Sequence, residues 1–226
     1  MRVWITRSEP GASRQAEVLR RAGHEVIVAP VLAIEPTRAP PPATGFRCVI
    51  FLSEHAVRHG GDLGFCAGAR VLAVGATTAR ALAGAGIDSE VPAASASEGL
   101  IELLADETLD GAAVLIVAGE DGRKTLRDTL IARGAQVSEF LCYRRRPLAG
   151  LPVRPVDVDA VLVGSQDGFR SFARLWFDGG GGAVRVIAAS ERIAGLGPTL
   201  GFPDVEVAAG PAAEDWMQAL ERRRNT

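Results

Sequence analysis

Residues 71–82 read V-L-A-V-G-A-T-T-A-R-A-L, and this stretch contains the unit from which the fold is built. An apolar run comes first, a short turn of Gly, Ala and Thr follows, and a helix rich in Ala and Leu comes last. A continuous apolar run is typical of a parallel strand that is buried on both faces. The stretch therefore predicts a buried parallel strand followed by a covering helix.

The same order of strand, turn and helix recurs along the chain. Apolar runs that precede a polar turn lie at residues 3–5, 48–52, 114–117, 161–163 and 184–188. Apolar positions at helical spacing predict helices over residues 11–22, near 97–105 and over 123–133. Ser95 and Glu98 predict a capping box for the second of these helices. Strands that alternate with helices indicate parallel α/β sheets.

A repeat of long period relates the two halves of the chain. Residues 3–7 and 20–26 resemble 114–119 and 132–137, residues 51–58 resemble 163–170, and residues 71–82 resemble 186–196. The repeat predicts two similar domains whose carboxyl strand ends face one cleft. Ligands of open α/β sheets bind at such edges.

Two groups of prolines interrupt the pattern about one domain apart. The first contains Pro36, Pro40, Pro41 and Pro42, and the second contains Pro147, Pro152 and Pro155. We interpret them as paired crossings between the domains, after Ile34 and after Tyr143.

The composition excludes several classes of protein. The 226 residues carry a formal net charge of −2, whereas a general nucleic-acid binder needs an excess of Lys and Arg. The three cysteines, Cys48, Cys66 and Cys142, have no C-x-x-C spacing, which indicates reduced thiols in a cytoplasmic protein. The N-terminal run does not predict a signal peptide, and no apolar run of about 20 residues predicts a membrane span.

The turns that follow the strands carry the chemistry that recurs most often. A turn that opens a helix exposes backbone N–H groups and a hydroxyl, which together can bind a carboxylate or a phosphate. Such turns lie at Thr6–Arg7, Ser53, Gly75–Thr78, Ser95–Ser97, Gly119–Gly122, Ser165 and Ser190. For each turn, a simple helix cap is the competing interpretation.

Several better-known sites are not indicated. No G-x-G-x-x-G follows a strand, and the segment from Gly119 to Thr125 has the wrong spacing for a nucleotide phosphate loop. His55 and His59 have the spacing of a helical metal pair, but without a third ligand a solvated helix face is the favoured interpretation. Covalent catalysis has no visible nucleophile, since Cys48 lies within a strand and no G-x-S-x-G occurs.

Tyr143 is the only tyrosine, and Arg144, Arg145 and Arg146 follow it. A phenol in this position could donate a proton to a leaving group, while the arginines attract an anionic substrate. An interfacial tyrosine on a connector, followed by a solvated basic run, is the equally favoured alternative.

In order and spacing, the chain resembles the uroporphyrinogen-III synthase family. The segments that carry the resemblance are I-T-R-S-E-P (5–10), L-R-R-A-G-H-E-V-I-V-A-P-V-L-A-I-E-P (19–36), F-L-S-E-H-A-V (51–57), A-V-G-A-T-T-A-R-A-L (73–82), S-A-S-E-G-L (95–100), L-I-V-A-G-E-D-G-R (115–123), G-A-Q-V-S-E-F-L-C-Y-R-R (134–145) and D-A-V-L-V-G-S (159–165).

The resemblance implies an α/β fold of two flavodoxin-like parallel-sheet domains joined by a two-stranded β-ladder. Residues 1–35 with 148–226 would form one discontinuous domain, and residues 42–138 the other. Residues 33–37 and 141–147 would form the ladder.

The resemblance also implies the reaction. Hydroxymethylbilane, a substrate with many carboxylates, would lose its terminal hydroxyl as water and close, with inversion of ring D through a spiro intermediate, to uroporphyrinogen III. No metal or organic cofactor, nucleic acid or membrane is expected, and the enzyme would act as a cytoplasmic monomer. A non-catalytic ligand-binding or regulatory module of the same fold and an unrelated transferase are the competing hypotheses.

Carried over to this chain, the resemblance makes Tyr143 the candidate proton donor. The implied substrate-binding residues are Arg7, Ser53, Gly75, Thr77, Thr78, Ser97, Gly119, Ser165 and Ser190. The chain departs from the family pattern at Leu52, at Gly164-Ser165 and at residues 189–192, and the last departure puts the role of Ser190 in most doubt.

Overall fold

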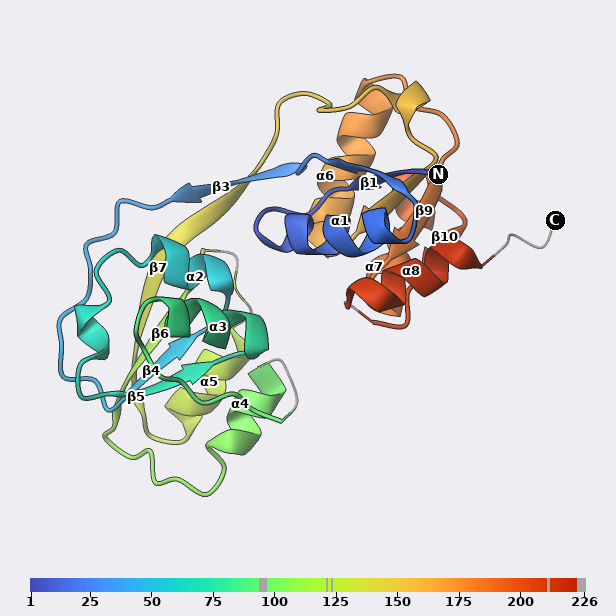
Figure 1. The fold of residues 1–226 in the computed structure, drawn as a ribbon. Coiled ribbons are helices and arrows are strands. Elements are labelled where there is room, and N and C mark those ends of the chain that lie inside the picture. Colours follow the sequence, from blue (N-terminus) through green and yellow to red (C-terminus); the bar gives the residue numbers. More distant parts are fainter. Residues whose placement is uncertain (94–96, 121, 123, 211, 223–226) are drawn as a thin grey trace. The chain divides into compact units, whose positions relative to one another are not determined.

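A computed structural model describes residues 1–93, 97–120, 122, 124–210 and 212–222 (Figure 1). Ser95, and with it the predicted capping box, lies outside these residues. The chain forms two compact units, one from Met1–Ala33 with Arg146–Thr226 and one from Ile34–Arg145. We call them unit 1 and unit 2. Among the described residues, no helix is both long and apolar enough to cross a membrane.

Unit 1 contains a five-stranded sheet in which the paired strands are parallel. Its order is β10-β9-β8-β1-β2, formed by β1 (Arg2–Ile5), β2 (Glu25–Val28), β8 (Ala160–Val163), β9 (Arg185–Ala188) and β10 (Val205–Val207). Read from β2, this is the strand order 2-1-3-4-5 of flavodoxin-like sheets.

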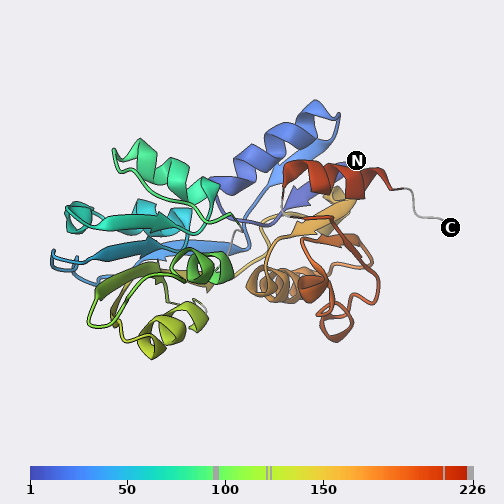
Figure 2. The same cartoon turned by 90° about the horizontal axis from the view of Figure 1, so that it is seen from below.

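Helices cover both faces of the sheet in unit 1 (Figure 2). Consecutive side chains of a strand point to opposite faces, so Trp4 packs with one core while Val3 and Ile5 pack with the other. The first core includes α6 (Gln166–Asp178) and α7 (Glu191–Ala194), and the second includes α1 (Gly11–Arg21) and α8 (Ala213–Glu221). This two-sided burial explains why the strands are continuous apolar runs.

Unit 2 is built in the same way. Its sheet has the order β3-β7-β6-β4-β5, with β3 (Leu32–Pro36), β4 (Cys48–Phe51), β5 (Arg70–Ala73), β6 (Ala113–Gly119) and β7 (Gln136–Pro147). The strands β5, β4, β6 and β7 pair in parallel. One face is covered by α2 (Glu54–His59) and α3 (Ala76–Gly84), and the other by α4 (Ser97–Leu103) and α5 (Thr125–Ala132).

The chain passes between the two units within strands β3 and β7. The unit boundaries fall between Ala33 and Ile34 and between Arg145 and Arg146. Strands β3 and β7 are hydrogen-bonded neighbours, and the backbone N–H of Thr37 donates to the carbonyl of Cys142 at 3.0 Å. Short 3₁₀ turns at Gly64–Cys66, Pro155–Asp157 and Pro198–Leu200 complete the connections.

Segments related by the sequence repeat occupy corresponding places in the two sheets. The neighbours β9-β8-β1-β2 of unit 1 match β5-β4-β6-β7 of unit 2 in the same order. Beyond β9 lies β10, and beyond β5 lies Glu90, which forms an isolated parallel bridge with Leu72. The repeat therefore reflects two copies of one sheet plan.

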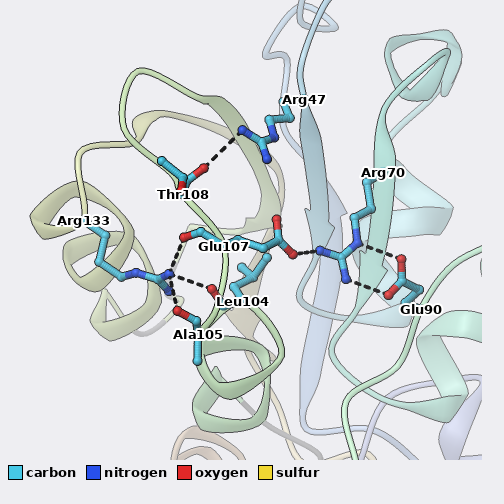
Figure 3. A network of polar contacts seen from close by, with 8 residues as sticks. All are labelled: Arg47, Arg70, Glu90, Leu104, Ala105, Glu107, Thr108 and Arg133. Carbon is cyan, nitrogen blue, oxygen red and sulfur yellow. Dashed lines mark hydrogen bonds and ion pairs between the residues drawn. The ribbon is translucent and has the colours of Figure 1, made fainter.

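Arginines hold the amino end of the sheet in unit 2 (Figure 3). Arg70, at the start of β5, makes two 2.7 Å hydrogen bonds to the Glu90 carboxylate and also pairs with Glu107. The Nη2 of Arg133 donates to the carbonyls of Leu104, Ala105 and Glu107 at 2.6 to 2.9 Å. These contacts fix the turn that follows α4 (Ser97–Leu103), so this polar network has a structural role.

The structure corrects one local prediction and shows the setting of Tyr143. Strand β6 continues to Gly119, two residues beyond the predicted run, so Gly119 belongs to a strand as well as to the turn. Tyr143 lies inside the 12-residue strand β7, where it is only 2% exposed and packs in one of the cores of unit 2.

Candidate active site

In unit 2, the candidate residues gather at the carboxyl edge of the sheet. Ser53 follows β4, Gly75 follows β5, and Gly119 ends β6 opposite Tyr143 of β7. These four strands are adjacent and parallel, so their carboxyl ends share one edge. The chain leaves β4 toward β5 on one side, while β6 and β7 lie on the other. The β4–β6 gap is therefore a topological switch point, the place where open α/β sheets bind ligands.

At this edge, the Tyr143 hydroxyl has two hydrogen-bond partners among the described residues. Its oxygen lies 3.0 Å from the Ser53 Oγ and accepts a hydrogen bond from the Nη2 of Arg145 at 2.9 Å. Ser53 is held in turn by the backbone N–H of Ala56, which donates to its Oγ at 3.0 Å and so caps α2. The phenol is therefore fixed by one neutral and one cationic partner.

A shift of register points Tyr143 into this position. Ala118 pairs with Leu141, but the next residue of β6, Gly119, pairs with Tyr143, so Cys142 is an extra residue. Cys142 and Tyr143 consequently pack in the same core, although neighbours in a regular strand point to opposite faces. Such bulges re-aim side chains, and they are frequent next to active sites.

Gly119 makes room for the tyrosine ring. A Cβ at this position would lie 2.6 Å from the Tyr143 Cζ, closer than any non-bonded carbon–carbon contact allows. The sequence presents Gly119 as part of an anion-binding turn, but its clearest role in the structure is to leave space for the phenol.

His55 and His59 flank Tyr143, so the predicted solvated helix face is wrong. Their ring centroids lie 5.5 and 6.0 Å from that of Tyr143, and both imidazoles are half-buried. Burial lowers the pKa of His55 to about 4, with further contributions from the positive charges of Arg145 and His59. Burial also lowers the pKa of His59. His55 is therefore neutral at pH 7.

The described residues offer no metal centre around this histidine pair. No group of three or more His, Cys, Asp or Glu side chains in the described ranges is arranged to hold an ion. The i, i+4 spacing serves aromatic packing against Tyr143 instead.

The remaining candidates of unit 2 differ in exposure. Thr78 is buried at 3% exposure, and its backbone N–H donates to the Gly75 carbonyl at 3.0 Å. Thr77 is half-buried and lies 3.5 Å from a nitrogen of Arg80. Ser97 is half-buried at the start of α4. Thr77 and Ser97 thus remain partly accessible, whereas the Thr78 side chain packs inside the unit.

In unit 1, the candidates follow the adjacent parallel strands β1, β8 and β9. Arg7 is exposed, and its guanidinium lies beside Gly11, where an added Cβ would be 2.5 Å from Nη2. Ser165 is exposed and caps α6 by accepting from the Gly168 N–H at 3.0 Å. Ser190 precedes α7 without a side-chain cap. The β1–β8 gap is the switch point of this sheet.

Ser165 corresponds to Ser53 in the repeat, and both hydroxyls accept from the N–H three residues later. Thr6, by contrast, is 3% exposed and donates to the Leu162 carbonyl at 2.7 Å. Thr6 therefore ties β1 to β8 rather than offering a group to a ligand.

Comparison with known proteins identifies the family. The family model described as "Uroporphyrinogen-III synthase HemD" matches residues 13–218. This chain belongs to the uroporphyrinogen-III synthase family. The uroporphyrinogen-III synthase of Escherichia coli K12 is 28% identical over 251 residues, which cover 98% of this chain and 100% of the relative.

Solved structures of the family share the fold. The uroporphyrinogen-III synthetase of Helicobacter pylori 26695 has a TM-score of 0.68 at 15% identity and covers 98% of this chain and 99% of its own. A mutant uroporphyrinogen III synthase of Thermus thermophilus has a TM-score of 0.59 at 20% identity, with 99% and 100% coverage. The fold of two α/β domains with parallel sheets is thus that of the uroporphyrinogen-III synthase family.

Proposed function

We propose that this chain converts hydroxymethylbilane into uroporphyrinogen III, with loss of water and inversion of ring D. Membership of the family supports the reaction. The observation that carries the assignment of the site is the Tyr143 hydroxyl, held between Ser53 and Arg145 at the switch point of unit 2.

In this proposal, Tyr143 is the proton donor of the first step. A phenol oxygen can accept hydrogen bonds while its own O–H donates. When the Ser53 hydroxyl donates to that oxygen, the phenol proton is left for the terminal hydroxyl of the bilane. The C–O bond then breaks, water leaves with the phenol proton, and the bilane carries the positive charge. After ring closure, a pyrrole carbon loses its proton, which restores the phenol.

We assign the carboxylates of the substrate to the turns at the two sheet edges. Backbone N–H groups at the starts of helices favour anions. The partly accessible residues Thr77 and Ser97 in unit 2, and Arg7, Ser165 and Ser190 in unit 1, border such turns. Many weak contacts of this kind would hold the bilane in the conformation that closes, since most of the catalytic effect comes from orientation.

The test is the identity of the product. Purified protein is supplied with hydroxymethylbilane, the product is oxidised, and porphyrin isomers I and III are resolved by chromatography. We expect isomer III, whereas isomer I alone would refute the proposed function, because the bilane closes unaided to that isomer.

The Tyr143→Phe variant tests the assigned proton donor. It should slow the reaction without abolishing it, because orientation of the bilane remains. Complete loss of isomer III in a variant with an unchanged circular dichroism spectrum would mean that the reaction depends on the phenol more than proposed.

The active species in this proposal is a monomer. Ser53, Tyr143 and Arg145 come from one chain, so their hydrogen bonds need no second copy. Sedimentation equilibrium at assay concentration should give the chain mass of 23.7 kDa.

A further inference from the structure

The guanidinium of Arg145 has an unusual set of partners. It donates to the Tyr143 hydroxyl at 2.9 Å and lies 5.2 Å from the centroid of the same ring. Within the described part of the chain, no carboxylate pairs with it. Arg144, its neighbour in β7, instead pairs with Glu35 at 3.1 Å.

The α2 side chain that senses the charge of Arg145 does not compensate it. His55 on α2 is neutral at pH 7, and the positive charge of Arg145 is one of the causes that lower its pKa. A guanidinium carries five N–H donors and can bind a carboxylate in a bidentate geometry, through two parallel hydrogen bonds. Among the described residues, the half-buried Arg145 donates to one neutral acceptor, so it has unused capacity for an anion.

Arg145 is one of the groups that cover Tyr143. The ring is 2% exposed, with His55 and His59 against it and the guanidinium over it. A proton donor must reach its acceptor within hydrogen-bond distance. Some covering group must move, and Arg145 is the one whose bond to the phenol is weaker than a bond to a carboxylate would be.

We propose that Arg145 is a substrate-positioning residue that binds one carboxylate of the substrate, and that this exchange of partners uncovers the Tyr143 hydroxyl. The proposal rests on the proposed function. It links recognition of the anionic substrate to exposure of the proton donor, so that the phenol is uncovered only when a carboxylate is present. Ser53 keeps the phenol in place after Arg145 has moved.

The kinetic test compares Arg145→Gln with Arg144→Gln, which removes an equal charge from the next residue of the same strand. We expect Arg145→Gln to raise the KM for hydroxymethylbilane by about 10- to 100-fold, the range of a lost charged hydrogen bond, with a much smaller effect on kcat. Arg144→Gln should change KM little. Equal KM values for the two variants would overturn the proposal.

A double variant separates binding from an indirect effect. If Arg145 binds the substrate, Arg145→Gln should raise KM by the same factor in the Tyr143→Phe background. If Arg145 acts only through the phenol, the effect disappears in that background and the proposal is wrong. Arg145→Lys keeps the charge but loses the bidentate geometry, so its KM should lie between those of the wild type and Arg145→Gln.

The accessibility of the Tyr143 phenol can be measured by chemical modification, without substrate turnover. Because Tyr143 is the only tyrosine, any 3-nitrotyrosine that forms with tetranitromethane comes from this residue, and its absorbance separates it from oxidised cysteines. Nitration of the substrate-free Arg145→Gln variant should be several-fold faster than that of wild type and of Arg144→Gln. Equal rates, in variants with unchanged circular dichroism spectra, would overturn the covering role.

Failure of the proposed function can be told apart from failure of this inference. A wild type that yields only isomer I would refute the proposed function. In that case calorimetric titration with uroporphyrin III, which also carries many carboxylates, tests the anion contact. Weaker binding by Arg145→Gln than by Arg144→Gln would still support the inference, and equal binding would overturn it.

Discussion

At the scale of single residues, the position of Tyr143 depends on a small neighbour, a neutral neighbour and a hydrogen-bonded neighbour. Gly119 has no side chain, so the ring fits against the backbone of β6. His55 is neutral, so it does not repel the positive charge of Arg145. Ser53 adds one hydrogen bond that α2 fixes. Each of these contributions can be changed by one substitution.

Substitution of Gly119 by Ala should displace the phenol. The added methyl would lie 2.6 Å from the ring, and forced overpacking costs about 1–3 kcal/mol of the free energy of unfolding. The rate of isomer III formation should fall at the same time. Gly84→Ala is the control, because no atom lies within 4 Å of its added Cβ. Urea unfolding followed by circular dichroism checks the prediction, and equal stability of the two variants would contradict it.

The neutral state of His55 should make the stability of unit 2 depend on pH. Its pKa falls from 6.5 to about 4 on folding, so between these values the unfolded chain binds a proton that the folded chain does not. The free energy of unfolding should therefore decrease as the pH falls from about 6.5 to 4. His55→Gln should weaken this decrease. Circular dichroism melts across the window test the prediction, and parallel profiles for both proteins would argue against it.

At the scale of elements, the strand-to-helix turns could be predicted because continuous apolar runs mark buried parallel strands. Other features of the site have no such signal. The register shift at Gly119 alters the side-chain alternation of β7, so that Cys142 and Tyr143 pack in the same core. The six-residue helix α2 is too short for its periodicity to show that His55 and His59 face inward.

The two serines that begin helices in unit 1 should differ in their contribution to stability. Ser165 accepts a hydrogen bond from the Gly168 N–H, whereas Ser190 makes no side-chain cap. Ser165→Ala should cost about 1 kcal/mol, and Ser190→Ala should cost little. All three tryptophans, Trp4, Trp176 and Trp216, are buried in unit 1, so tryptophan fluorescence during urea unfolding measures this unit. Equal losses would show that the cap does not stabilise α6.

At the scale of the whole molecule, the two units share one strand arrangement but take their strands from the chain in different orders. Unit 2 uses one continuous stretch, whereas the strands of unit 1 come from both ends of the chain. The repeat could reveal two similar domains because it matches strand to strand. It could not reveal the place of Glu90, since a single bridging residue has no apolar run.

Because unit 2 is one continuous stretch of the chain, we expect it to fold by itself. A fragment of residues 30–147 contains strands β3 to β7 and both of the cores that cover their sheet. It should show a cooperative urea transition by circular dichroism. The control fragment 1–33 contains β1 and β2 without their neighbour β8 and should stay unfolded. A non-cooperative 30–147 fragment would mean that unit 2 depends on unit 1.

The split of unit 1 has a consequence for protein synthesis. Strand β1 pairs with β8, which the ribosome makes only after all of unit 2. At about 5–20 residues per second, the apolar residues of β1, α1 and β2 wait for roughly ten seconds before their partner emerges. The growing chain thus completes unit 2 before unit 1, and throughout that time its N-terminal segment lacks the strand that will cover one edge of β1.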